Sequence, residues 1–223
     1  YNIIFKNAYI DKMYISKYQW YIKNYITGID INILPVIDLC NKVDTRLGII
    51  DSFIDVNNEE KNTNESDILS LNNHGEYISS IITGKYPLKG FYSLLKLERL
   101  NLYSIFKFDD NQYLKKTSDY FIDAISEASR NKIRVLNCSF GGWEYLESEY
   151  NAIKNARNIL FVVSAGYNST NIDLIPRYPA CYNLDNIIVV GAVDKEGLLY
   201  KTSNYGKTVD IFAPGEDICG LIQ

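Results

Sequence analysis

The single histidine and one strand-end aspartate are the residues of this sequence best suited to proton-transfer chemistry. His74 is followed by Gly75 and by an apolar run with helical spacing. Asp51 closes residues 47–50, an apolar run typical of a buried strand. An aspartate placed there can accept a hydrogen bond from the imidazole, fix its tautomer and stabilise its charged form. The histidine can then take a proton from a hydroxyl nucleophile near neutral pH.

Taken alone, each of these two residues has a simpler interpretation. A lone histidine is more often a surface residue or a hydrogen-bonded core residue, and an aspartate at a strand end often caps the next turn. Their placement favours catalysis, because active sites of open parallel sheets gather where the carboxyl ends of strands lead into helices. Asp51 and His74 both lie at such junctions.

The elements that must position these residues follow an alternating pattern. Apolar runs predict strands at residues 46–51, 102–108, 133–139, 159–164, 187–193 and 209–212. Helical spacing predicts helices at residues 74–83, 118–131 and 145–157. Several strands are continuous Ile, Val and Leu runs, as in strands buried on both faces. The pattern predicts the α/β class, with a doubly wound, mostly parallel sheet flanked by helices.

The chain contains no internal repeat and no linker that would divide it. Residues 1–40 are expected to form an N-terminal arm that packs on the domain, and residues 41–223 to form the domain itself. Residues 55–66, rich in Asn, Asp and Glu, are expected to form a solvated loop.

Six segments between about residues 44 and 215 resemble, in the same order, the segments of the subtilases, the subtilisin-like serine proteases. They are the strand ending in Asp51-Ser52, the His74-Gly75 pair with its helix, and residues 135–142, 161–168, 177–194 and 203–215. One Asp-Ser or His-Gly pair would carry no weight, whereas six collinear matches are highly specific. The resemblance implies a subtilisin-like fold and an endopeptidase that hydrolyses peptide bonds through an Asp-His-Ser triad.

The resemblance also implies roles for individual residues. Asp51 would orient His74, and His74 would act as general base and then as general acid. Ser139, Phe140 and Gly141 would line the substrate cleft, their alternative being an ordinary tight turn after a strand. Asn168 would hold the oxyanion.

The N-terminal arm resembles that of one subtilase branch, the bacterial lantibiotic leader peptidases, which trim the leader from modified peptide antibiotics. Gln19-Trp20 and residues 25–28 carry this resemblance. It implies a peptide substrate such as a lantibiotic precursor. We further expect a monomer located in the cytoplasm, with secretion as the alternative.

The sequence departs from the subtilase pattern at three positions near the site. Phe53 stands where the family has Gly after Asp-Ser. Glu76 stands where it has Thr, and this carboxylate is expected to raise the pKa of His74. Tyr167 occupies the oxyanion position in an ungapped match, with Asn168 one residue later. We expect a shifted loop to bring Asn168 into place, the alternatives being the Tyr167 hydroxyl or backbone N–H groups.

The Gly-Thr-Ser segment that carries the nucleophile in the family does not occur before Gln223. The chain is therefore expected to be a partial sequence, truncated before the nucleophilic serine and lacking the C-terminal part of the fold. The competing hypothesis is a non-catalytic subtilase relative that binds peptides or regulates a partner, which Phe53, Tyr167 and the missing serine favour. A nucleotide-binding α/β domain is rejected, because residues 51–55 contain no glycine for a phosphate loop.

Composition further narrows the class of protein to which the chain can belong. Hydrophobic residues make up 47% of the 223 residues, which indicates a globular protein. The net charge of −4, without a long basic run, gives no indication of nucleic-acid binding. No stretch approaches the roughly 20 apolar residues of a spanning helix, so no membrane segment is predicted.

The cysteines and acidic residues show no metal pattern. The four cysteines are widely spaced and lack a CxxC pair, so we expect reduced, structural thiols at Cys40, Cys138, Cys181 and Cys219. The chemistry requires no cofactor. Subtilases commonly bind structural calcium, for which Asp38, Asp55 and residues 59–67 supply oxygen atoms, but no ordered ligand loop is evident.

Overall fold

A six-stranded parallel sheet forms the centre of the protein. The computed structural model describes residues 19–36, 46–52, 74–83, 100–105 and 117–219. The sheet has the order β2-β1-β3-β4-β5-β6, and every neighbouring pair is parallel. Its strands are β1 Leu47–Asp51, β2 Leu100–Ser104, β3 Val135–Cys138, β4 Leu160–Ser164, β5 Ile187–Val193 and β6 Ile211–Pro214.

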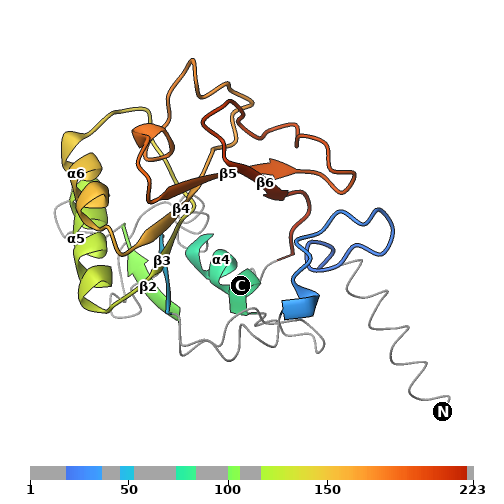
Figure 1. The fold of residues 1–223 in the computed structure, drawn as a ribbon, viewed down its shortest axis with the longest axis horizontal. Helices are drawn as coiled ribbons and strands as arrows, with labels where there is room; N and C mark the ends of the chain where they lie inside the picture. The colour runs from blue at the N-terminus through green and yellow to red at the C-terminus, as the bar shows by residue number, and fades with distance from the viewer. Residues whose placement is uncertain (1–18, 37–45, 53–73, 84–99, 106–116, 220–223) are drawn as a thin grey trace, which may run out of the picture.

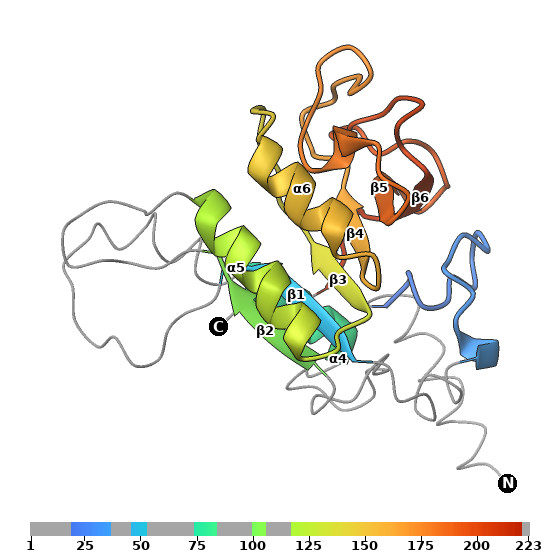
Figure 2. The ribbon, with the colours of Figure 1, turned by 60° about the vertical axis from the view of Figure 1, so that its left-hand side comes forward.

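Helices cover both faces of the sheet. They are α4 His74–Thr83, α5 Thr117–Arg130 and α6 Glu147–Asn155, with short 3₁₀ turns η1 Leu34–Val36 and η3 Ala180–Tyr182. Helices α5 and α6 lie together on one face and α4 lies on the other, as Figures 1 and 2 show. The predicted doubly wound α/β fold is thereby confirmed.

The core lies between the sheet and helices α5 and α6. In α5 the residues at positions 121, 124, 125 and 128 are buried, which is the i, i+3, i+4, i+7 spacing of one helical face. They pack against the central strands, where Leu136 and Phe161 are completely buried. Strand β1 is buried at each of its last four residues, whereas buried and half-buried residues alternate along β3 and β4.

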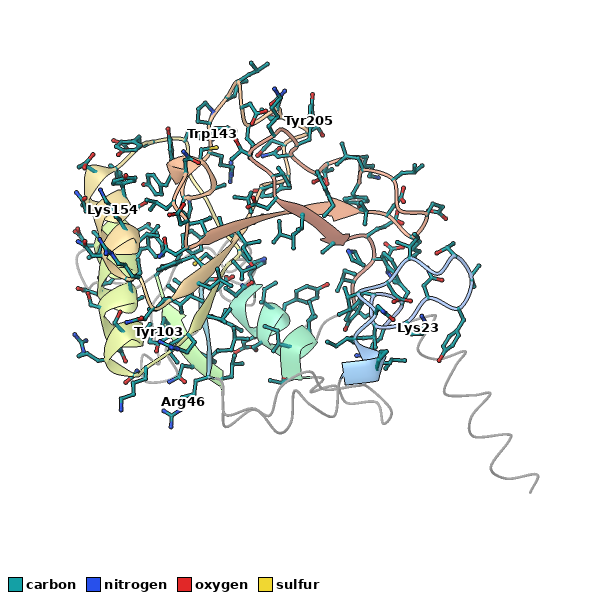
Figure 3. The ribbon with its side chains drawn as sticks, in the orientation of Figure 1. Lys23, Arg46, Tyr103, Trp143, Lys154 and Tyr205 are labelled. Atoms are coloured by element: carbon teal, nitrogen blue, oxygen red, sulfur yellow. The ribbon has the colours of Figure 1, made fainter. Side chains whose placement is uncertain are left out.

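The strand order reverses beside β1, which pairs with β2 on one side and β3 on the other. Such a switch point opens a crevice at the carboxyl ends of the strands. The register aligns Ile50 with Cys138 and Cys138 with Val163, so β1, β3 and β4 end at the same edge. Figure 3 shows Trp143 among the loops at this end of the sheet and Arg46, just before β1, at the other.

The described part of the N-terminal segment lies against the end of β6 and the loop after β5 (Figure 1). The Trp20 indole Nε1 donates a hydrogen bond to the Glu216 carbonyl at 2.9 Å, and the Thr27 hydroxyl donates to the Lys195 carbonyl at 2.7 Å. Trp20 and Ile22 are buried. The boundary at residue 40 lies outside the described residues and stays a prediction.

Strand bounds differ from prediction both in the central strand β3, predicted at residues 133–139, and at the edges of the sheet. Strand β6 begins two residues later than predicted, because the Asp210 carboxylate accepts a hydrogen bond from the Val189 N–H and Ile211 is the first residue to pair. It ends at Pro214, which an edge strand tolerates. The predicted loop at residues 55–66 lies outside the described residues. Among the helices that are described, none is both long and apolar enough to cross a bilayer.

Candidate active site

Asp51 and His74 form a hydrogen-bonded pair at the carboxyl edge of the sheet. Asp51 is the last residue of β1 and His74 is the first residue of α4. The His74 Nδ1 atom lies 2.7 Å from Asp51 Oδ1. The structure therefore brings together two residues 23 positions apart, in the arrangement that the sequence predicted.

The backbone fixes both members of the pair. The Gly75 N–H donates to the Ser52 carbonyl at 3.0 Å, which ties the start of α4 to the end of β1. The Ser52 N–H donates to Asp51 Oδ1 at 2.7 Å, which orients the carboxylate. Since Oδ1 accepts from both Ser52 and the imidazole, the carboxylate can hold Nδ1 as the protonated nitrogen and leave Nε2 available as a base.

The pair is asymmetric in its exposure. The Asp51 side chain is 6% exposed and the His74 side chain 46%. The hydrogen bond to Asp51 raises the pKa of His74 above its usual 6.5; burial opposes this and the negative charge of Asp51 adds to it. Asp51 rather than Glu76 thus accounts for the raised pKa. The arrangement stabilises the imidazolium that forms when His74 accepts a proton.

Cys138 lies beside this pair as a buried thiol. Burial raises the pKa of Cys138 strongly, and the charge of Asp51 adds to the effect, so the thiol stays protonated. Cys138, Cys181 and Cys219 are free in the described part of the chain, and Cys40 lies outside it, so the reduced state of the four thiols stays a prediction.

The predicted cleft residues directly follow β3. The Ser139 hydroxyl accepts a hydrogen bond from Asn137 Nδ2 at 2.8 Å. The half-buried Phe140 ring packs edge-to-face on Phe121 of α5 with 5.2 Å between centroids, so one side of the ring lies against the core. Gly141 directs its carbonyl to the guanidinium of Arg177 at 2.8 Å.

Asn168 lies in the loop after β4, which also leaves the sheet at its carboxyl edge. Its backbone N–H donates to Asn204 Oδ1 at 2.8 Å, and Asn204 also receives the Thr170 N–H at 3.0 Å. The completely buried Asn204 donates its Nδ2 to the Ala165 carbonyl at 2.8 Å. The loop that carries Asn168 is thus held at three backbone positions, while the side chain of Tyr167 is 72% exposed.

Arg177 and Asn204 are the residues of this region to which the sequence analysis assigned no role. Arg177 begins the segment at residues 177–194 and connects it to the loops after β3 and β4, through the Gly141 carbonyl and through Asn168 Oδ1 at 3.3 Å. Asn204 lies in the segment at residues 203–206. Both residues stood inside segments that resembled the family, but no local spacing indicated their contacts.

The part of the chain that is described contains no group of three or more His, Cys, Asp and Glu side chains placed to hold a metal. The residues considered for calcium, Asp38, Asp55 and residues 59–67, lie outside the described ranges, as does Phe53.

Comparison with known proteins finds relatives among the subtilisin-like proteases. "Subtilisin-like protease 2" of Arthroderma otae is 36% identical over 149 residues, which cover 64% of this chain and 32% of the relative. The chain therefore spans about a third of the length of the curated relatives that it matches.

Solved structures share the fold. The patellamide maturation protease PatA superposes with a TM-score of 0.60 at 27% identity, covering 79% of this chain and 68% of PatA. The prenylagaramide maturation protease PagA has a TM-score of 0.63 at 22% identity, covering 85% of this chain and 71% of PagA, a likeness of fold alone. The family model described as "Subtilase family" matches residues 27–222, so the chain belongs to the subtilase family.

Proposed function

We propose that the protein is a serine endopeptidase that hydrolyses peptide bonds through an Asp-His-Ser triad, with Asp51 and His74 as two of its members. The observation that carries this proposal is the 2.7 Å hydrogen bond between His74 Nδ1 and the buried carboxylate of Asp51. The subtilase family match and the relatedness to subtilisin-like proteases support the reaction class.

In the proposed reaction, His74 Nε2 removes the proton from a serine hydroxyl as its oxygen bonds to the peptide carbonyl carbon. Asp51 stabilises the resulting imidazolium through Nδ1–H. The imidazolium then gives its proton to the leaving amine as the C–N bond breaks. Water, deprotonated by His74, hydrolyses the acyl-enzyme and restores the serine.

The nucleophile in this proposal is a serine of a Gly-Thr-Ser-like segment in the complete gene product. Asn168 is proposed to donate to the oxyanion. The backbone of residues 139–141 is proposed to pair with an extended substrate by adding it as a strand.

We propose that the substrate is a precursor peptide that the protease matures by removing its leader. The N-terminal resemblance to lantibiotic leader peptidases supports this class, and PatA, 27% identical, is described as a maturation protease. A lantibiotic precursor is the specific substrate we propose.

The test uses the protein expressed from the complete reading frame, and it begins by reading that frame beyond Gln223. The proposal expects a Gly-Thr-Ser-like segment within about 20 residues, followed by an apolar helix. The purified protein is then assayed against a quenched fluorescent precursor peptide, beside His74→Ala and a Glu196→Gln control. Glu196 lies in the exposed turn after β5. The control is expected to keep full activity and His74→Ala to lose it.

A continuous frame without the serine segment would overturn the proposal and favour the non-catalytic relative. That alternative predicts peptide binding without cleavage, and binding that His74→Ala leaves intact.

A further inference from the structure

The guanidinium of Arg177 joins two loops of the site that are far apart in sequence. Its Nη2 donates to the Gly141 carbonyl at 2.8 Å and its Nη1 to Asn168 Oδ1 at 3.3 Å. We propose that Arg177 is a positioning residue that fixes the side-chain amide of Asn168 with Nδ2 as its free donor. This inference rests on the proposed function, in which Asn168 donates to the oxyanion.

The chemistry of the two groups decides the orientation of the amide. An arginine side chain carries only donors, so the Asn168 atom that faces it must be the carbonyl oxygen Oδ1. The NH₂ group must then point away from Arg177, and its position no longer depends on an arbitrary choice between oxygen and nitrogen. The contact with a cation also polarises the amide, which strengthens Nδ2 as a donor.

Arg177 is itself rigidly held, as a positioning residue must be. Arg177 is buried, with an exposed fraction of 9%. Its guanidinium carbon lies 4.9 Å from the centroid of the Trp143 ring and 5.9 Å from that of Tyr167, within the range of cation–π contacts. Tyr167 occupies the expected oxyanion position in the sequence, but in the structure its ring contacts the guanidinium of Arg177, which in turn orients Asn168.

The charge of Arg177 is directed at neutral acceptors. Within the described ranges no carboxylate forms an ion pair with this residue. A buried guanidinium is costly unless its donors are used, and Gly141 and Asn168 each accept a hydrogen bond from one of them. Among the described residues the charge of Arg177 therefore acts on the Asn168 amide and the Gly141 carbonyl.

The loop that carries Asn168 is also tightly packed at Gly166. Gly166 has φ +99°, and a Cβ there would lie 2.8 Å from Arg177 Cδ and 2.4 Å from Asn204 Nδ2. Asn204 holds the Asn168 backbone while Arg177 holds its side chain. The two contacts together define where Nδ2 lies.

The kinetic test compares four variants of the complete protein: Arg177→Met, Arg177→Lys, Asn168→Ala and the double variant Arg177→Met/Asn168→Ala. Arg157→Met is the matched control, because Arg157 is exposed and precedes β4 at the other end of the sheet. In subtilisin, removing the side-chain amide that donates to the oxyanion lowers kcat by about 10²–10³.

We expect Arg177→Met to lower kcat by about 10- to 100-fold with KM changed less than about 2-fold, and Arg177→Lys to restore part of the loss. The double variant should fall no further than Asn168→Ala alone, because both substitutions remove one unit. Additive losses in the double variant would overturn the inference. So would an Arg177→Met effect confined to KM for substrates with one type of side chain, which would assign Arg177 to substrate recognition.

A second measurement does not depend on activity. Nuclear magnetic resonance of ¹⁵N-labelled protein follows the two Asn168 side-chain NH₂ protons, which should be well separated and slow to exchange while Arg177 is present. In Arg177→Met they should approach the positions of exposed amides, and in Arg157→Met they should not move. Unchanged Asn168 resonances in Arg177→Met would overturn the inference. If the complete protein cleaves no peptide, the proposed function fails, and these resonances still decide whether Arg177 fixes the amide.

Discussion

Replacing Asp51 with Asn removes the charge of the pair while keeping its shape. The amide oxygen can still accept from the Ser52 N–H, which lies 2.7 Å from Oδ1, and from His74 Nδ1. The negative charge that raises the pKa of His74 is lost, whereas the burial that lowers it remains. We therefore expect the pKa of His74 in Asp51→Asn to lie below that of the native protein.

The expected stability change is small compared with the catalytic change. A hydrogen bond to a charged group contributes about 1.5–3 kcal/mol and a neutral one about 0.5–1.5 kcal/mol, a difference of roughly 1 kcal/mol. Because the His74 side chain is 46% exposed, solvent screening reduces this to about 0.5 kcal/mol. The corresponding change in the chymotrypsin triad lowers kcat by about 10⁴. The account thus predicts a nearly inactive protein of almost native stability.

The pH dependence of that stability difference has a defined sign. The folded pKa of His74 is raised above 6.5, so its contribution to stability is fully present below pH 6.5 and is lost as the pH rises through the folded value. The free energy of unfolding should therefore be higher for the native protein than for Asp51→Asn. This difference should be largest at the acidic end of the window and should shrink as the pH rises.

The assay is a nuclear magnetic resonance titration of the imidazole Hε1 proton together with urea unfolding below and above this window. His74 is the one histidine of the 223 residues, and the loss of its Hε1 signal in His74→Ala assigns the resonance in the protein that is titrated. A native His74 that titrates at or below the value in Asp51→Asn would refute the reasoning. So would a stability difference that grows with pH.

Three further predictions concern the surroundings of the pair. Gly166→Ala should destabilise the protein by about 1–3 kcal/mol in urea unfolding, since its Cβ would lie 2.4 Å from Asn204 Nδ2 at a φ of +99°. A loss below about 0.5 kcal/mol would contradict the packing described. Asn204→Ala should cost about 2–4 kcal/mol, because it leaves the Asn168 N–H and other backbone groups unpaired; wild-type unfolding would refute this. Cys138 should resist alkylation in the folded protein at pH 8 and react in urea, as mapped by mass spectrometry, because burial raises its pKa; rapid labelling in the native state would show the thiol to be accessible.

The sequence was most informative where local pattern and tertiary setting agree. The helix predicted at residues 74–83 is found as α4 His74–Thr83, and the strand at residues 187–193 as β5 Ile187–Val193. The apolar residues of α4 have helical spacing, and β5 is a continuous run of apolar residues. Strand β2 instead begins at Leu100, two residues before the predicted start, because pairing with Leu47 extends it. Such an extension depends on the neighbouring strand and has no local signal.

The residues of the site were likewise predictable only where a local sequence pattern marked them. Asp51 and His74 could be found because each lies at a strand or helix end within a recognisable segment. The contacts of Arg177 with Gly141 and Asn168 span 36 and 9 residues and join three loops, so they depend on how those loops fold. Phe140 was predicted in the cleft, but whether its ring faces substrate or Phe121 is likewise set by the packing of α5.

The most direct test of the account is labelling of the complete protein with a fluorophosphonate, followed by mass spectrometry of the modified peptide. The account predicts a single modified serine in a Gly-Thr-Ser-like segment before an apolar helix. Labelling should be abolished in His74→Ala, strongly slowed in Asp51→Asn and unchanged in Arg157→Met. Labelling that persists in His74→Ala, or an unlabelled native protein, would contradict the claim that Asp51 and His74 serve a nucleophilic serine.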